Sequence, residues 1–118
     1  MLDRHLDAFL SNLKIVRQLS PHTVNSYKRD LTGFFSFLKK ENNSWDEIRD
    51  HQVREFINRE RRRGLSPRSL KRVLSSIRSF FNYLTDEEIV SSNPALGIST
   101  PKSKSFFTKS TSSALGRS

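Results

Sequence analysis

The sequence predicts an all-α protein, an orthogonal bundle of four to five helices built from two related helix hairpins. Apolar side chains recur every three or four residues along most of the chain, as they do on the buried face of a helix. Two segments begin with the same Leu-Ser-Pro triplet, which is typical of a helix start. The 118 residues suffice for one domain, and they include no cysteine and only four glycines. This composition excludes disulfide scaffolds, thiolate metal sites and glycine-rich phosphate loops.

The first two helices are expected at about residues 2–17 and 21–40. The first apolar stripe consists of Leu2, Leu6, Phe9, Leu10, Leu13 and Val16. We expect Ser20 to cap the second helix, with Pro21 in the first turn, where its missing N–H costs nothing. The second stripe consists of Val24, Tyr27, Leu31, Phe34, Phe35 and Leu38.

The third helix is expected at about residues 51–62. Ser44 and Glu47 fit a capping box before a short turn, and Asp50 offers a second N-cap. Gly64 suits the left-handed position that follows a helix. The core side of this helix consists of Val53, Phe56 and Ile57.

The fourth helix is expected from Pro67 to about residue 85, with Ser66 as its cap. Its stripe consists of Leu70, Val73, Leu74, Ile77, Phe80, Phe81 and Leu84. Residues 1–98 are expected to form the helical domain. Residues 99–118 are rich in Ser, Thr and Lys and are expected to form a flexible tail.

The expected second and fourth helices belong to an internal repeat. Residues 19–38 align without gaps on residues 65–84, with six of twenty positions identical. Two copies fit two helix hairpins packed as a bundle. Phe37 and Tyr83 occupy equivalent places off the main stripes, where we expect each to meet another helix; a contact to a second subunit is the alternative.

Positive charge is concentrated in one part of the chain. The formal net charge is +9, and residues 59–85 alone carry eight Lys or Arg side chains against one Glu, a net of +7. A polyanion releases counterions only where several cations meet it together, so this concentration indicates a binding surface. The alternative is a solvated helix face.

The outward faces of the two repeated helices carry small polar side chains and cations without a carboxylate. Small residues permit close approach, Arg and Lys reach phosphates or guanine edges, and both helix starts offer free N–H groups. The Ser residues at these starts also serve as caps, and the two roles are compatible. The DNA-binding candidates are Ser20, His22, Thr23, Asn25, Ser26 and Arg29 in the first copy, and Ser66, Arg68, Ser69, Lys71, Arg72, Ser75 and Arg78 in the second.

No catalytic or metal site is expected in this sequence. His5, His22 and His51 lack metal-ligand spacing, and no pair of carboxylates stands out from caps and surface charge. We therefore expect no cofactor and no small-molecule ligand, and nothing in the sequence supports an enzyme acting alone. No apolar run forms a membrane span or a signal core, so a cytoplasmic location is expected.

Several motifs together resemble the N-terminal core-binding domain of tyrosine recombinases. They are residues 20–31, residues 64–84, Asn93-Pro94-Ala-Leu-Gly97 and Pro101-Lys102, in an order that is similar to Xer-type and phage-integrase-family proteins. The resemblance covers about residues 3–102. It implies a SAM-like bundle of four or five helices that forms one jaw of a C-shaped clamp around a recombination half-site. The segments 21–39 and 67–84 would then lie against double-stranded DNA, with other recombinase subunits as further partners.

The resemblance also places the catalytic Arg, Lys and His residues and the Tyr nucleophile of such enzymes in a second, larger domain. None of these residues can be placed on this sequence, and residues 103–118 do not resemble that domain. The chain is therefore expected to be a fragment of a recombinase or a truncated one. The family's reaction needs neither a metal nor a nucleotide cofactor.

Two other function classes remain open at this point. A helical protein–protein interaction module would bind its partner through Phe37, Tyr83 or the Phe106-Phe107 pair, with an affinity that resists salt. A small helical transcriptional regulator would read an operator as a dimer. It would need a short recognition helix after a tight turn, whereas this sequence offers two long repeated helices.

Overall fold

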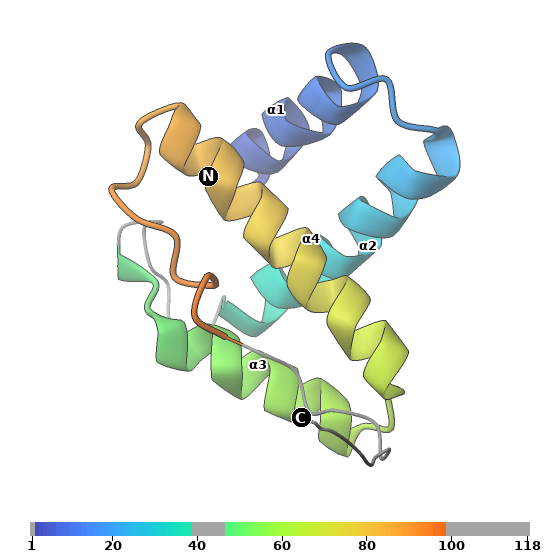
Figure 1. The fold of residues 1–118 in the computed structure, drawn as a ribbon, viewed down its shortest axis with the longest axis vertical. Helices are drawn as coiled ribbons and strands as arrows, with labels where there is room; N and C mark the ends of the chain where they lie inside the picture. Colours follow the sequence, from blue (N-terminus) through green and yellow to red (C-terminus); the bar gives the residue numbers. More distant parts are fainter. Residues whose placement is uncertain (1, 39–46, 99–118) are drawn as a thin grey trace, which may run out of the picture.

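Four helices make up the part of the chain that the computed structural model describes, residues 2–38 and 47–98. They are α1 (Leu2–Ile15), α2 (Pro21–Leu38), α3 (Asp50–Arg62) and α4 (Pro67–Asp86). Helix α4 lies across α2, with α1 at one end of the crossing and α3 at the other (Figure 1). No strand occurs in the two described ranges, and the predicted all-α class is confirmed.

The turn between α3 and α4 follows the local signals that the sequence contains. Gly64 has a φ of 103°, and around it the Leu65 N–H bonds to the Glu60 carbonyl at 3.1 Å. The Gly64 N–H bonds to the Arg61 carbonyl at 3.0 Å, which completes the Schellman pattern of a glycine-terminated helix. Ser66 then caps α4, as predicted.

The start of α3 differs from the prediction. Arg49, not Asp50, is the N-cap, and Asp50 is the first helical residue. The Gln52 side chain accepts a hydrogen bond from the Arg49 backbone N–H at 2.8 Å, which is the reciprocal bond of a capping box. The proposed Ser44–Glu47 capping box lies partly outside the described residues.

The end of α1 also differs from the prediction. The helix ends at Ile15, and the side chain of Val16, assigned to the apolar stripe, is 70% exposed. Gln18 adopts a positive φ of 53°, and the Leu19 N–H bonds to the Leu13 carbonyl at 3.0 Å. This turn brings Leu19 against the core in place of Val16.

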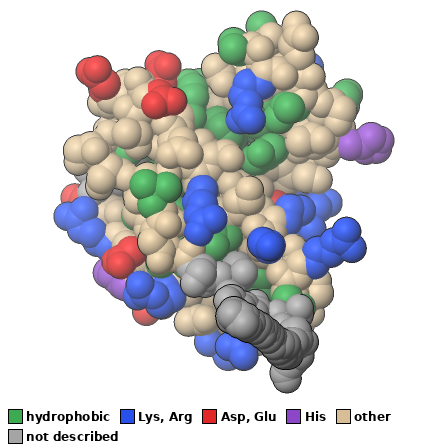
Figure 2. All heavy atoms as spheres, viewed as in Figure 1, with side chains coloured by type: hydrophobic (Ala, Val, Ile, Leu, Met, Phe, Trp, Pro, Cys, Tyr) green, Lys and Arg blue, Asp and Glu red, His purple; other side chains and the backbone are tan. Residues whose placement is uncertain are grey.

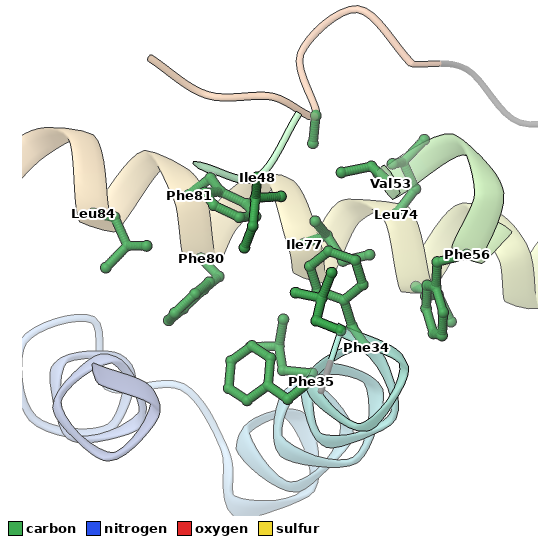
Figure 3. Close-up of a cluster of buried hydrophobic side chains, with 14 of the residues drawn as sticks. Phe34, Phe35, Ile48, Val53, Phe56, Leu74, Ile77, Phe80, Phe81 and Leu84 are labelled. Atoms are coloured by element: carbon green, nitrogen blue, oxygen red, sulfur yellow. The ribbon is translucent and has the colours of Figure 1, made fainter. Parts of the chain in front are cut away.

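Phenylalanine rings fill the crossing of α2 and α4, and they do so reciprocally. The Phe35 and Phe80 ring centroids are 5.4 Å apart, and those of Phe34 and Phe81 are 6.4 Å apart. Figure 3 shows these rings pointing toward one another from the two helices. Because Phe34 corresponds to Phe80 in the repeat, and Phe35 to Phe81, each contact is the counterpart of the other. The two repeated helices are thus related by an approximate two-fold axis, as in an isologous interface.

Helices α1 and α3 are related by the same approximate two-fold axis. Phe9 of α1 packs on Phe80 and Tyr83 of α4, with ring centroids 5.4 and 5.5 Å apart. Phe56 of α3 packs on Phe34 and Phe37 of α2, at 5.2 and 5.4 Å. The prediction that Phe37 and Tyr83 meet other helices is therefore confirmed, as is the prediction of two related hairpins.

The segment after α4 turns back toward α3 and closes the core (Figure 1). Val90, Ala95 and Ile98 are buried in it, and Ile98 is the last described residue. The tail predicted for residues 99–118, with its Phe106-Phe107 pair, lies outside the described residues. Among the described helices, none is both long and apolar enough to cross a membrane.

Candidate nucleic-acid interface

The starts of α2 and α4 are built alike. Ser20 Oγ accepts the Thr23 N–H at 3.3 Å, and Ser66 Oγ accepts the Ser69 N–H at 3.2 Å. The two hydroxyls at each start also contact each other, at 3.0 Å in α2 and 3.2 Å in α4. Neither helix has an acidic residue in its first turn, so the positive end of each helix dipole is left uncompensated.

Most of the candidate side chains on the two helices are exposed. Those exposed on α2 and its cap are Ser20, His22, Thr23, Asn25 and Arg29, and Ser26 is half-buried. Those exposed on α4 and its cap are Ser66, Arg68, Lys71, Arg72 and Ser75, whereas Ser69 and Arg78 are half-buried. The two helices therefore present these polar side chains to solvent while their apolar stripes face the core.

Arg72 has a partner that the sequence analysis did not assign. Its Nε and Nη2 donate to Oδ2 and Oδ1 of Asp30 at 3.1 and 3.0 Å. Ser76 Oγ donates to the same Oδ2 at 3.0 Å. The Asp30 side chain is 3% exposed, against 43% for Arg72, and the hydrogen bond between them raises the pKa of Arg72 above its usual value. The expected carboxylate-free surface therefore has one carboxylate buried directly beneath it.

This network lies at the approximate two-fold axis that relates α2 and α4. Ser76 is the repeat counterpart of Asp30, so the contact between them joins equivalent positions. The alignment at an offset of 46 residues contains this signal, since a residue on a two-fold axis meets its own counterpart. The outward face of each helix, taken separately, does not contain this signal.

Arg78 is engaged within the fold. Its Nε donates to the Ala95 carbonyl at 3.1 Å, and its Nη2 donates to the Ile98 carbonyl. Asn93 Nδ2 donates to the Arg78 carbonyl at 3.1 Å, which ties the same segment to the backbone of α4. Arg78 thus anchors the segment after α4, and part of its donor capacity is already used.

Cations at the end of α3 were counted in the basic stretch but were not assigned to the site. Arg59 and Arg63 both pair with Glu60, at 3.2 and 3.1 Å. Arg61 and Arg62 are exposed and have no ion-pair partner among the residues that the structure describes. They immediately precede the turn into α4, so they extend the positive charge beyond the assigned helices.

Charge is unevenly distributed over the face that carries α4. Figure 2 shows most of the Lys and Arg side chains over its middle and lower part, where a few acidic side chains also lie at the left, and a group of acidic side chains at the upper left, near the end of α4. The helix itself has the same polarity, since Arg68, Lys71 and Arg72 lie in its first half and Asp86 at its end. This gradient opposes the helix dipole, which favours anions at the N-terminus. This charge distribution therefore destabilises the isolated helix. An external anion bound at the helix start would offset that cost.

A metal-binding arrangement is not found in the described part of the chain, where no three His, Asp or Glu side chains are grouped to hold an ion. His5 lies half-buried on α1, His22 at the start of α2 and His51 at the start of α3. What the described side chains offer is hydrogen-bond donors and positive charge.

Comparison with known proteins gives a matching family profile and similar proteins of known name. The sequence profile of the phage integrase N-terminal SAM-like domain matches residues 6–88. The chain is 40% identical over 102 residues to tyrosine recombinase XerC of Pseudomonas savastanoi pv. phaseolicola, covering 86% of this chain and 34% of that protein. It is 41% identical, with the same coverage, to tyrosine recombinase XerC of Pseudomonas syringae pv. syringae. The chain spans about a third of the length of these curated relatives.

Proposed function

Since this chain belongs to the family of phage integrase N-terminal SAM-like domains, we propose that it is a DNA-binding domain of a site-specific tyrosine recombinase. In this role it holds double-stranded DNA at a recombination half-site through α2 and α4. It supplies affinity and positioning, and strand cleavage is assigned to residues outside this sequence. Other recombinase subunits on the same DNA are its further proposed partners.

The observation that carries this proposal is the gathering of cations on the first half of α4. Arg68 and Lys71 are exposed beside a helix start that lacks acidic residues. Phosphate groups compensate both the cations and the helix dipole, so DNA removes the electrostatic cost of the arrangement. The small side chains Ser66, Ser69 and Ser75 allow a duplex to approach the helix closely.

The candidate residues have different proposed roles. Arg68, Lys71 and Arg29 supply phosphate contacts, since they are exposed and no ion pair engages them among the described residues. Asn25, Ser26, His22 and Thr23 supply the polar contacts of α2. Arg78 contributes long-range charge only, because its side chain is bonded to backbone carbonyls.

Titration of the 118-residue chain with duplex oligonucleotides at low salt tests this proposal. Amide signals of α2 and α4 are expected to shift, and log K is expected to fall linearly with log salt. Lys71→Gln should reduce the slope by about one unit, because one phosphate contact is lost. Lys14→Gln, on α1, is the matched control and should leave the slope unchanged. Unmoved amide signals on both helices would overturn the proposal.

A further inference from the structure

Arg72 differs from the free cations of the proposed surface because a buried carboxylate fixes one edge of its guanidinium, while the side chain remains partly exposed. A guanidinium has five N–H donors in one plane, and Asp30 accepts two of them. The other donors lie on the remaining edges of a side chain that is 43% exposed. The fixed edge therefore determines the direction in which the free donors point.

The pairing also changes what Arg72 contributes electrostatically. With the Asp30 carboxylate at hydrogen-bond distance, the pair carries no net charge, so it attracts a phosphate less than a free cation does. The conformational entropy of the long side chain has already been lost in folding. Such a group gains from a ligand whose acceptors match its geometry, since ordering it costs nothing further.

A gain in stability alone accounts poorly for this network. Removing an ionised carboxylate from water is costly, and apolar side chains of similar volume commonly hold helices together at least as well. Asp30 is buried on α2, the helix that contributes Phe34 and Phe35 to the aromatic contacts with α4. The cost is incurred beneath a guanidinium that is itself partly exposed at the outer surface.

We propose that Asp30 is a positioning residue that makes Arg72 a sequence-reading side chain, with the free edge of its guanidinium donating to O6 and N7 of a guanine. This inference rests on the proposed function and adds a source of specificity to it. Guanine presents these two acceptors side by side in the major groove, and a planar fork matches them in a way that a lysine cannot. Ser76 completes the arrangement by holding Oδ2 of the carboxylate.

Selection of bound duplexes from a randomised library, followed by sequencing, tests this inference with the 118-residue chain. The unmodified chain is expected to enrich guanine at one position by about tenfold over other bases. Arg72→Lys keeps the charge but lacks the fork, and it should lose this enrichment while the salt dependence of binding stays the same. Asp30→Asn should also lose the enrichment, while its affinity for unselected duplexes is kept or increased.

Lys71→Gln is the matched control, because it removes a free cation from the same helix face. It should lower the affinity for all duplexes evenly and keep the guanine enrichment. Circular dichroism establishes that each variant is folded; if Asp30→Asn does not fold, Arg72→Lys decides the question. Enrichment that survives in Arg72→Lys would overturn the inference, as would binding by the unmodified chain without any guanine preference. Absence of all duplex binding would overturn the proposed function as well.

Discussion

Single side chains on the α2–α4 surface divide into free cations and engaged ones, and the division is invisible in a count of charges. Lys71 and Arg72 are adjacent in the sequence and both are exposed, yet only Arg72 has a buried partner. Periodicity predicted correctly that both lie outside the core. It could not predict the ion pair, because that depends on how α2 and α4 cross, which local patterns do not encode.

We expect substitutions of Arg72 and Lys71 to differ in their effect on the free energy of unfolding. Arg72→Gln leaves the buried Asp30 carboxylate with Ser76 as its remaining side-chain partner, so the free energy of unfolding should fall by about 1–2 kcal/mol, a value reduced for the exposure of Arg72. Lys71→Gln should change it by less than about 0.5 kcal/mol. Urea denaturation followed by circular dichroism measures both. Equal effects of the two substitutions would contradict the engaged role of Arg72.

His5 gives the chain a pH-dependent stability. Burial lowers its pKa from the ordinary value of 6.5, and the nearby Arg4 charge acts in the same direction. As the pH falls through about 6.5, His5 therefore binds a proton in the unfolded chain before it does so in the folded chain. This contribution to stability should be complete above that pH and lost as the pH falls through the lowered pKa. The urea midpoint should drop between pH 7.5 and 5.5, and His5→Gln should reduce the drop; an unchanged drop would exclude His5 as its source.

At the scale of elements, the sequence predicted helices better than it predicted their ends. All four helices lie within a few residues of their expected ranges, because each has a strong apolar stripe and three have a Ser-Pro or glycine signal nearby. The missed ends have physical causes. The turn at Gln18 requires a positive φ from a residue that rarely adopts one, and α3 is capped one residue earlier than expected, at Arg49, where Gln52 bonds the backbone N–H.

Gly64 carries the turn that joins α3 to α4. A Cβ at this position would meet nothing within 4 Å, so a substitution acts only through the backbone φ of 103°. Gly64→Ala should lower the free energy of unfolding by about 1–2 kcal/mol. Gly97→Ala is the matched control, since a Cβ there also meets nothing within 4 Å and no positive φ is involved. Equal urea midpoints for the two variants would contradict the backbone cause.

The molecule as a whole is held together by aromatic contacts between the two hairpins and by the segment that follows α4. The repeat in the sequence predicted the hairpins, and the equivalent contacts of Phe9 and Phe56 confirm them. The return of residues 90–98 could not be predicted in the same way. Its polar anchors are hydrogen bonds made by Arg78 and Asn93, which leave no periodic pattern.

We propose that the domain extends through Ile98, and truncation tests this boundary. A chain that stops after Ile98 should keep the thermal midpoint of the full chain. A chain that stops after Ser92 loses the buried Ala95 and Ile98 side chains and the Asn93 and Arg78 contacts. It should lose about 2–4 kcal/mol of unfolding free energy. Equal midpoints for the two truncated chains would place the boundary before Asn93.

Asp30 and Ser76, the unequal pair at the two-fold axis, affect whether two copies of this chain can exchange helices. The Phe34 and Phe35 rings of α2 correspond to the α4 rings that they contact, so α2 of one copy could place the same rings against α2 of another. Such an exchange would press Asp30 against a second Asp30 in an apolar interior and strand both Arg72 side chains elsewhere. In α4, Ser76 at the axis donates a hydrogen bond to the Asp30 carboxylate. The difference between Asp30 and Ser76 thus disfavours exchange between copies and favours pairing of the two hairpins within one chain.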